Sequence, residues 1–266
     1  MPKFESNLMY MFNEFDLIDR YEQASLSGFS GVELQSPYSM TIDNILDKLD
    51  KFNLKHIIIN LPVIDPDTGI GNLALRPDKK DLFLERLDLG TKYAKALGCI
   101  GINTGIGIYP SGFENDEVYQ TLIENQKIAS ETLSKCGIKA LIEPINTVDQ
   151  PHFYINTSAQ AVDLINQIDH PNAFLLYDVY HMQIMEGDLI RTIKESIDYI
   201  GHFHTAGNPG RNDLDDEQEI YYPPIMDAIA RIGYDLYVGH EFTPKADPIA
   251  AMKAAFDTCD ITVKRQ

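Results

Sequence analysis

The chain has 266 residues, of which 44% are hydrophobic and 23% charged, a composition ordinary for a globular protein with a sizeable core. Acidic residues outnumber basic ones by 40 to 22, and the formal net charge of −18 disfavours binding to nucleic acid. No apolar run approaches the roughly 18 residues needed to cross a bilayer, so we expect no membrane role. Three cysteines without paired spacing, and no stretch that resembles a signal peptide, predict a cytoplasmic location.

Eight short β-rich runs recur along the chain, and stretches with helical periodicity separate them. Gly28, Gly98, Gly137 and Gly233 end helical stretches just before a β-rich run, as glycines with positive φ do. Thr157 followed by Gln160 predicts a capping box that opens another helix. The predicted strands are residues 4–10, 31–35, 55–62, 99–105, 139–146, 173–181, 200–206 and 236–242.

Regular alternation of strands and helices predicts an α/β fold with a parallel sheet. A chain near 250 residues suits a closed barrel, so we expect a single (β/α)8 TIM barrel, one domain over residues 1–266. An open doubly wound sheet would carry a glycine-rich turn after its first strand, and residues 10–14 have no glycine. The acidic stretch 211–219 is expected to be a loop after the seventh strand.

Four side chains that can bind a divalent metal lie at or near the ends of the last four predicted strands: Glu143, Asp178, His204 and Glu241. They are spaced by roughly 30 residues, about the length of one strand-plus-helix unit. Parallel strands in a barrel present their C-terminal ends on one face, so these residues are expected to converge on one ion. The alternative is a set of buried polar residues that satisfy one another by hydrogen bonds.

Three carboxylates and one imidazole form a mainly oxygen ligand set, which favours Mn²⁺, Mg²⁺ or Co²⁺ and leaves Zn²⁺ as an alternative. His202 should lie one layer below His204, and His240 should face the helices. Glu33 is expected in the buried polar floor. Three asparagines could line the barrel mouth and contact substrate: Asn7, Asn60 and Asn103.

The blocks at residues 141–146 and 177–187 and the segment 200–202 resemble the signature blocks of the hydroxypyruvate isomerase family, within the xylose isomerase-like superfamily. This resemblance implies that Glu143, Asp178, His204 and Glu241 bind the metal and that Glu143 and Glu241 act as acid and base. It also implies that His181 and Arg211 contact substrate. The alternatives are a helix-entry role for His181 and, for Arg211, charge balance with the acids of the 211–219 loop.

The resemblance implies an isomerase that interconverts hydroxypyruvate and tartronate semialdehyde through an enediolate, with one divalent ion and no nucleotide cofactor. Two positions depart from the family pattern. His204 stands where bacterial hydroxypyruvate isomerases tend to have glutamine and is similar to ketose 3-epimerases, and Ile59 replaces a frequent histidine. A ketose 3-epimerase is therefore the first alternative. An endonuclease IV-type DNA repair enzyme and a non-catalytic sugar-binding barrel follow.

The expected partner is a small hydroxy-keto acid or sugar, with no nucleic acid and no membrane, and assembly into a homo-oligomer is left open. Glu186 is expected first as a favourable charge near a helix start.

Overall fold

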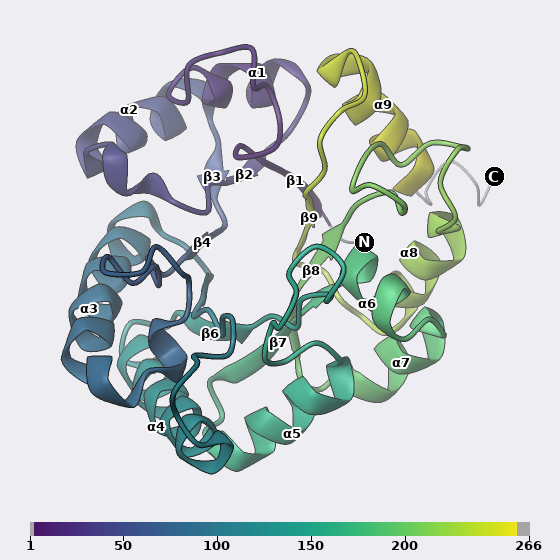
Figure 1. Ribbon diagram of the computed structural model, residues 1–266. Coiled ribbons are helices and arrows are strands. Elements are labelled where there is room, and N and C mark those ends of the chain that lie inside the picture. The colour runs from purple at the N-terminus through teal and green to yellow at the C-terminus, as the bar shows by residue number, and fades with distance from the viewer. Residues whose placement is uncertain (1–2, 260–266) are drawn as a thin grey trace.

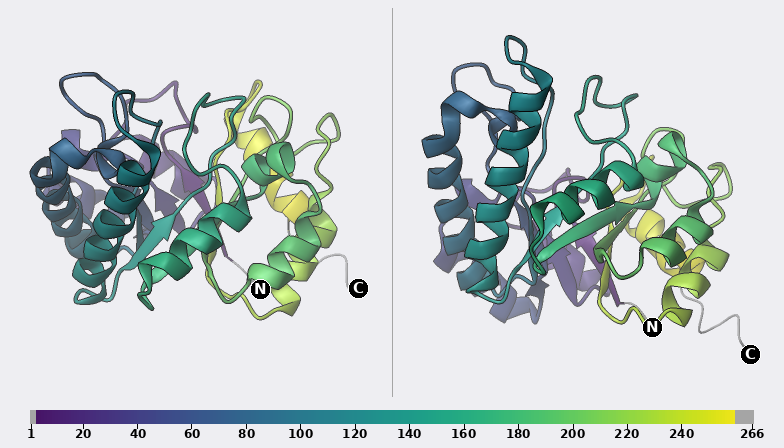
Figure 2. Two further views of the ribbon diagram at one scale, coloured as in Figure 1. Left: turned by 60° about the horizontal axis from the view of Figure 1, so that its bottom comes forward. Right: turned by 90° about the horizontal axis from the view of Figure 1, so that it is seen from below.

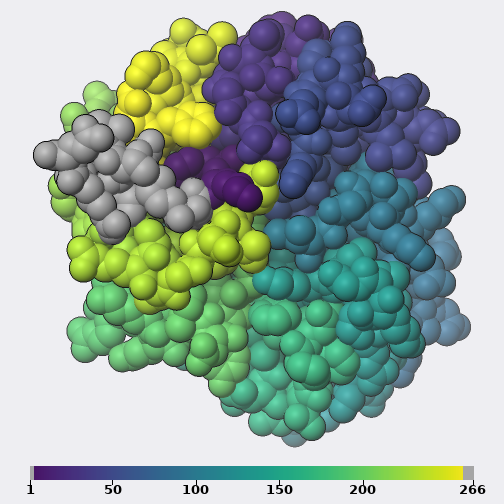
Figure 3. Space-filling model, turned by 180° about the vertical axis from the view of Figure 1, so that it is seen from behind, coloured from purple at the N-terminus to yellow at the C-terminus, as the bar shows by residue number. Residues whose placement is uncertain are grey.

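The computed structural model of the protein describes residues 3–259, which form a barrel of parallel strands inside a ring of helices (Figure 1). The predicted (β/α)8 barrel is confirmed. Seen from behind, the successive segments follow one another around the barrel in sequence order (Figure 3). Residues 1, 2 and 260–266 of the predicted domain 1–266 lie outside the described part of the chain.

Strands and helices alternate along the described residues. The strands are β1 (Lys3–Asn7), β2 (Gly31–Glu33), β3 (Lys55–His56), β4 (Ile58–Asn60), β5 (Gly101–Asn103), β6 (Lys139–Ile142), β7 (Ala173–Asp178), β8 (Ile200–Thr205) and β9 (Tyr237–His240). The helices are α1 (Arg20–Leu26), α2 (Ile42–Phe52), α3 (Lys80–Leu97), α4 (Asn115–Ser134), α5 (Ser158–Ile168), α6 (Val179–Met185), α7 (Leu189–Ser196), α8 (Tyr222–Arg231) and α9 (Pro248–Cys259).

The barrel closes through the third predicted strand, which is split into β3 and β4 at Ile57. All neighbouring strands are parallel, in the order β3-β2-β1-β9-β8-β7-β6-β5-β4. The Ile57 amide donates to the carbonyl of Val32, and its carbonyl accepts from the amide of Ile100, each at 2.9 Å. Ile57 thereby links the two ends of the sheet, and the nine strand segments make eight barrel positions.

The barrel floor is filled by a small apolar cluster, separate from the larger core between barrel and helices. The cluster contains Ile57, Ile58, Leu141, Leu176 and Tyr237. Glycines make room for these side chains. A Cβ added at Gly31 would lie 2.6 Å from the Tyr237 ring, and one at Gly101 would lie 2.7 Å from Leu141 Cδ1. The floor is therefore a packed layer that closes the N-terminal end of the barrel.

Several helix ends that were predicted from local sequence patterns are confirmed. The four glycines predicted to end helical stretches have positive φ, for example 70° at Gly98 after α3. The capping box of Thr157 and Gln160 is present at the start of α5. His240 faces the helices as expected, since its ring meets that of Phe256 in α9 edge-on with the ring centroids 6.2 Å apart.

One local prediction is wrong. The predicted strand 173–181 ends at Asp178, because the Asp178 side chain accepts from the amide of Tyr180 and begins α6, so His181 is helical. Glu186, expected as a favourable charge near a helix start, follows the end of α6. Its carboxylate accepts from the amide of Ser158 at 2.9 Å, so the helix start that it stabilises is that of α5.

The long loops that follow the strands gather at one end of the barrel, as the side views in Figure 2 show. These loops surround the C-terminal strand ends, where barrel enzymes carry their active sites. Among residues 3–259, no helix is both long enough and apolar enough to span a bilayer.

Replacing Gly201 with alanine should lower the free energy of unfolding by about 1–3 kcal/mol because the barrel floor is already filled. The new Cβ would lie 2.7 Å from Phe174 Cβ and 2.8 Å from Leu141 Cδ2. Urea unfolding measures the change. Gly71→Ala is the control, since nothing lies within 4 Å of its added Cβ and its φ is not positive. Equal unfolding midpoints for the two variants would contradict this account of the floor.

Candidate active site

Four side chains meet at the mouth of the barrel. Glu143 and Glu241 each lie one residue beyond a strand, β6 and β9, while Asp178 ends β7 and His204 lies in β8. One ligand atom from each residue lies within 4.8 Å of the others. Glu143 is the most exposed of the four, at only 5%. The structure therefore brings together the residues that the sequence placed on four separate strands.

Three of these side chains carry buried polar atoms without a hydrogen-bond partner: Glu143 Oε1, His204 Nδ1 and Glu241 Oε2. His204 Nδ1 is 2.7 Å from Glu241 Oε2 and 3.6 Å from Glu143 Oε1, yet neither contact has hydrogen-bond geometry. These atoms therefore lie in close ion pairs rather than in well-formed hydrogen bonds with one another. A carboxylate-rich set with one imidazole fits a single Mg²⁺, Mn²⁺ or Co²⁺ ion, or Zn²⁺.

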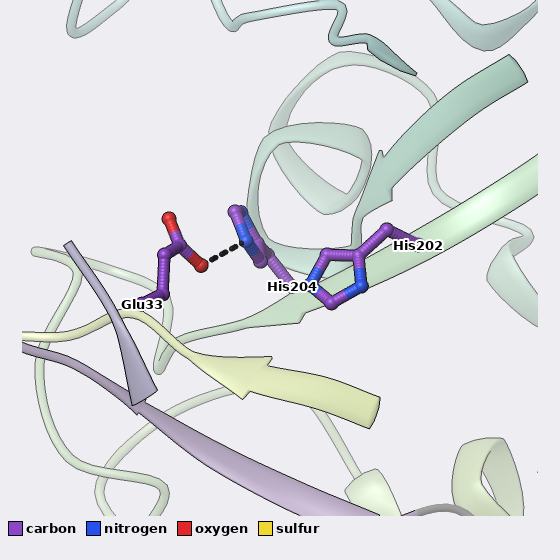
Figure 4. A group of neighbouring side chains, drawn as sticks. All are labelled: Glu33, His202 and His204. Carbon is purple, nitrogen blue, oxygen red and sulfur yellow. Dashed lines mark hydrogen bonds and ion pairs between the residues drawn. The ribbon is translucent and has the colours of Figure 1, made fainter. Parts of the chain in front are cut away.

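A second layer below these four side chains orients His204 (Figure 4). His204 Nε2 lies 2.9 Å from Glu33 Oε2, and the other oxygen of Glu33 accepts from the Asn7 amide at 2.9 Å. With Nε2 beside Glu33, Nδ1 is the nitrogen directed at Glu143 and Glu241. Burial acts to lower the pKa of His204, but the charges of Glu33 and Glu241 outweigh it and raise that pKa well above its usual value, so a cation bound here would take the place of the Nδ1 proton. Glu33 thus belongs to the polar floor, as expected, and has a defined contact there.

His202 and Glu5 form a deeper pair, with Nε2 and Oε1 2.8 Å apart and both side chains fully buried. The rings of His202 and His204 are perpendicular, with centroids 5.1 Å apart. Glu33, His202 and His204 could themselves offer three ligand atoms within 4.8 Å. Since Glu33 and His204 are already at hydrogen-bond distance, the geometry there suits a proton better than an ion.

Burial and opposing charges set the electrostatics of the barrel interior. Burial raises the pKa of Glu5 to about 8 and that of Glu33 to about 7. Burial also acts to raise the pKa of Glu241, but the charges of Arg211 and His204 outweigh it and lower that pKa to about 2. The deeper carboxyl groups therefore retain protons more readily, whereas Glu241 at the mouth stays ionised.

Arg211 lies in this site rather than in a solvated acidic loop. Its Nη2 is 2.8 Å from Glu241 Oε2 and 3.4 Å from Asp178 Oδ2. The guanidinium also lies over the rings of Tyr10 and Tyr180, 4.9 and 5.5 Å from their centroids.

Two acids of the 211–219 loop form ion pairs with another cation. Lys245 pairs with Asp215 and Glu217 at 2.8 and 3.0 Å. Lys245 therefore balances the charge of these two acids without Arg211. The backbone of Arg211 has a positive φ of 55°.

The three candidate asparagines have different positions. Asn60 and Asn103 line a cavity of about 240 Å³ at the barrel mouth. The amide of Asn103 donates to Glu143 Oε2 at 2.7 Å, which fixes that carboxylate. Asn7 is fully buried, and its side chain donates to Glu33 and accepts from the amide of Met9. Asn7 therefore lies below the cavity rather than at the mouth.

His181 also lines the cavity, although it comes from α6 rather than from a strand end. Its Nδ1 contacts the Asn146 amide nitrogen at 2.6 Å, while its Nε2 is buried without a hydrogen-bond partner. Burial lowers the pKa of His181 to about 4, and the nearby Arg211 charge adds to this effect. The imidazole is therefore neutral at ordinary pH.

Several cavity residues were not singled out from the sequence, among them Tyr10, Gln35 and Asp149. The side-chain amide of Gln35 donates to Glu241 Oε1. Gln35 lies two residues after Glu33 in the predicted strand, so the same alternation that pointed Glu33 inward could have identified it. Tyr10 and Asp149 lie in loops, for which the sequence carried no comparable signal.

A closed parallel barrel with a buried carboxylate and imidazole cluster at its C-terminal strand ends defines the class as a TIM-barrel enzyme. The family described as "Xylose isomerase-like TIM barrel" matches residues 21–259. The chain therefore belongs to the xylose isomerase-like TIM barrel family.

Similar proteins span nearly the whole chain. Hydroxypyruvate isomerase from Escherichia coli is 36% identical over 95% of this chain and 98% of its own length. 2-Oxo-tetronate isomerase from Haemophilus influenzae is 32% identical over 95% and 97%. A crystal structure of a Brucella melitensis protein named AP endonuclease, family 2, is 33% identical, covers 97% and 98%, and has a TM-score of 0.92. The resemblance stated from the sequence, and the isomerase class that it implied, are confirmed.

Proposed function

We propose that this protein is a metal-dependent isomerase of a small α-hydroxy carbonyl acid, and that it interconverts hydroxypyruvate and tartronate semialdehyde. The observation that carries the proposal is the pair of carboxylates, Glu143 and Glu241, that line one small cavity beside a metal-type ligand set. The names of the E. coli and H. influenzae relatives support a hydroxy-keto acid as the substrate class.

The proposed reaction moves hydrogen within one molecule and needs no external oxidant. One carboxylate removes a proton from the carbon that carries the hydroxyl group, which gives an enediolate. The proton returns to the neighbouring carbon, and the proton of the original hydroxyl passes to the former carbonyl oxygen. A bound divalent ion would supply Lewis-acid polarisation of the carbonyl and hydroxyl oxygens.

In each proposed acid–base residue, one carboxylate oxygen accepts a hydrogen bond and the other faces the site. Asn103 donates to Glu143 Oε2, which leaves Oε1 without a partner. Gln35 donates to Glu241 Oε1, while Oε2 faces Arg211 and His204. This fixed orientation suits proton transfer, because a general base must be placed within hydrogen-bond reach of its proton. Arg211 is the one Lys or Arg among the described residues that line the cavity, and we assign it to the substrate carboxylate.

A ketose 3-epimerase remains the second candidate, because His204 completes the ligand set and two carboxylates could serve the two faces of one carbon. Product analysis separates the candidates. Aldehyde formed from hydroxypyruvate supports the isomerase, whereas inversion at C3 of a ketohexose without that aldehyde supports the epimerase. Ligand stabilisation without turnover would instead identify a non-catalytic sugar-binding barrel.

The DNA repair alternative is disfavoured by charge, although the similar Brucella protein is named an AP endonuclease. A formal net charge of −18 opposes the approach of a polyanion. A gel shift with abasic DNA at low salt checks this point, and tight binding would revive the alternative.

Glu143→Gln and Glu241→Gln should each lower kcat about 10²- to 10⁴-fold because an amide cannot accept the substrate proton. Incorporation of solvent deuterium into hydroxypyruvate, followed with Mg²⁺ or Mn²⁺ present, reports the proton transfer directly.

Glu124→Gln is the matched control for these two variants, since Glu124 pairs with Lys80 on the surface. It should exchange deuterium at the wild-type rate. Wild-type exchange in either site variant would remove that glutamate from the mechanism.

Glu33→Gln should weaken Mn²⁺ binding about 10- to 100-fold, because the neutral amide no longer increases the basicity of His204. Titration calorimetry on metal-free protein measures this without any assay of activity. Glu186→Gln makes the same change at a carboxylate that binds Ser158, and should leave Mn²⁺ affinity unchanged. Equal Mn²⁺ affinity in wild type and Glu33→Gln would contradict the proposed contact.

A further inference from the structure

The Nδ1 atom of His181 is surrounded by hydrogen-bond donors. The side-chain nitrogen of Asn146 lies 2.6 Å from it, and the backbone amide of Asn146 lies 3.5 Å from it. An atom that faces two N–H groups must accept, so the single proton of the neutral imidazole is on Nε2.

This assignment depends on the orientation of the Asn146 amide, which its other contacts fix. Asn146 Oδ1 accepts from the backbone amides of Val148 at 3.0 Å and Asp149 at 2.8 Å. Its Nδ2 donates to Asp149 Oδ2 at 3.0 Å. Turning the amide over would break both backbone bonds and set a carbonyl oxygen against a carboxylate, so Nδ2 must face His181.

Asp149, which contacts Asn146, is also hydrogen-bonded to α6. Tyr180, the residue before His181, donates its hydroxyl to Asp149 Oδ2 at 2.9 Å. The Asn146 side chain is fully buried, and His181 is too. The loop after β6 and the start of α6 therefore form one hydrogen-bonded unit that gives the imidazole a fixed orientation.

The opposite end of the ring faces the cavity. His181 Nε2 is buried without a hydrogen-bond partner. Asp178 Oδ2 is 3.4 Å away but without hydrogen-bond geometry to His181, and it accepts from Arg211 Nη2 at 3.4 Å. A buried N–H without an acceptor is costly, so this donor is available for an oxygen atom of a ligand.

We propose that Asn146 is a positioning residue that holds His181 as the neutral Nε2–H tautomer, with the donor directed at an oxygen of the substrate. The identity of that oxygen, a carbonyl that gains negative charge during enolisation, rests on the proposed function. A neutral N–H stabilises such an oxygen by hydrogen bonding and leaves proton transfer at carbon to the carboxylates.

Nitrogen NMR of the histidine rings tests the tautomer without any substrate. The Mg²⁺-loaded, ¹⁵N-histidine-labelled protein should show an unprotonated Nδ1 and a protonated Nε2 for His181, with the signal assigned by its loss in His181→Gln. A protonated Nδ1 in the wild type overturns the inference. Because this measurement needs no turnover, it decides the tautomer even if the proposed function fails.

Asn146→Asp tests the positioning role, because a carboxylate accepts a proton from Nδ1 instead of donating one. The His181 signals should change to the Nδ1-protonated or charged form, while those of His240 stay in place. With a substrate that wild type turns over, kcat should fall about 10²-fold, the usual loss on removing one such donor, and KM should change much less. Unchanged tautomer and unchanged kcat would overturn the proposal.

Two controls separate this role from general damage to the fold. Asn172→Asp removes a partly buried amide donor elsewhere, since the Asn172 side chain donates to the carbonyls of Ser130 and Ile138 at 3.2 and 2.8 Å, and should alter neither His181 nor kcat. In a His181→Gln background, Asn146→Asp should lower kcat little further, because its effect passes through the ring. A full additional loss there would mean that Asn146 acts by another route. Should Asn146→Asp fail to fold, Asn146→Ser repeats the NMR test.

Discussion

Compensation of buried negative charge is the constraint on which the rest of this barrel depends. Five carboxyl groups point into or over its interior, and a carboxylate among apolar strands is stable only when it is paired, protonated or bound to a cation. His204 and Arg211 provide the positive charge near the mouth, while burial favours protonation deeper in the barrel. The five groups are Glu5, Glu33, Glu143, Asp178 and Glu241.

The positions of these groups follow from simple periodicity, which is why much of the site could be read from the sequence. Alternation along a strand places Glu143 on the inward face with Leu141, and parallel strands in a barrel bring such residues to one end. The split of β3 and β4 at Ile57 did not disturb this prediction, because Ile57 keeps its hydrogen bonds to both neighbouring strands. The positions of the site residues therefore depend more on the geometry of the barrel than on the length of any single strand.

Some side chains take their direction from a loop or from a side-chain contact that ends a strand. These directions could not be predicted from the sequence. Arg211 lies beside acids in the sequence, yet its guanidinium lies over the rings of Tyr10 and Tyr180 and contacts Glu241. Asp178 ends its strand early because its side chain caps α6, and that turn carries His181 into the cavity. Both outcomes depend on contacts between segments far apart in the chain, which local patterns do not encode.

The two histidines of the site, His204 and His181, have hydrogen-bond partners of opposite kinds. Glu33 Oε2 lies 2.9 Å from Nε2 of His204, which leaves Nδ1 directed at the carboxylates of Glu143 and Glu241. Asn146 donates to Nδ1 of His181 and so leaves Nε2 with the proton. One imidazole thus directs Nδ1 at the position that a cation would occupy, and the other presents an N–H, as an anionic oxygen requires. The chemistry of each ring is decided by the residue behind it, since the rings themselves are identical.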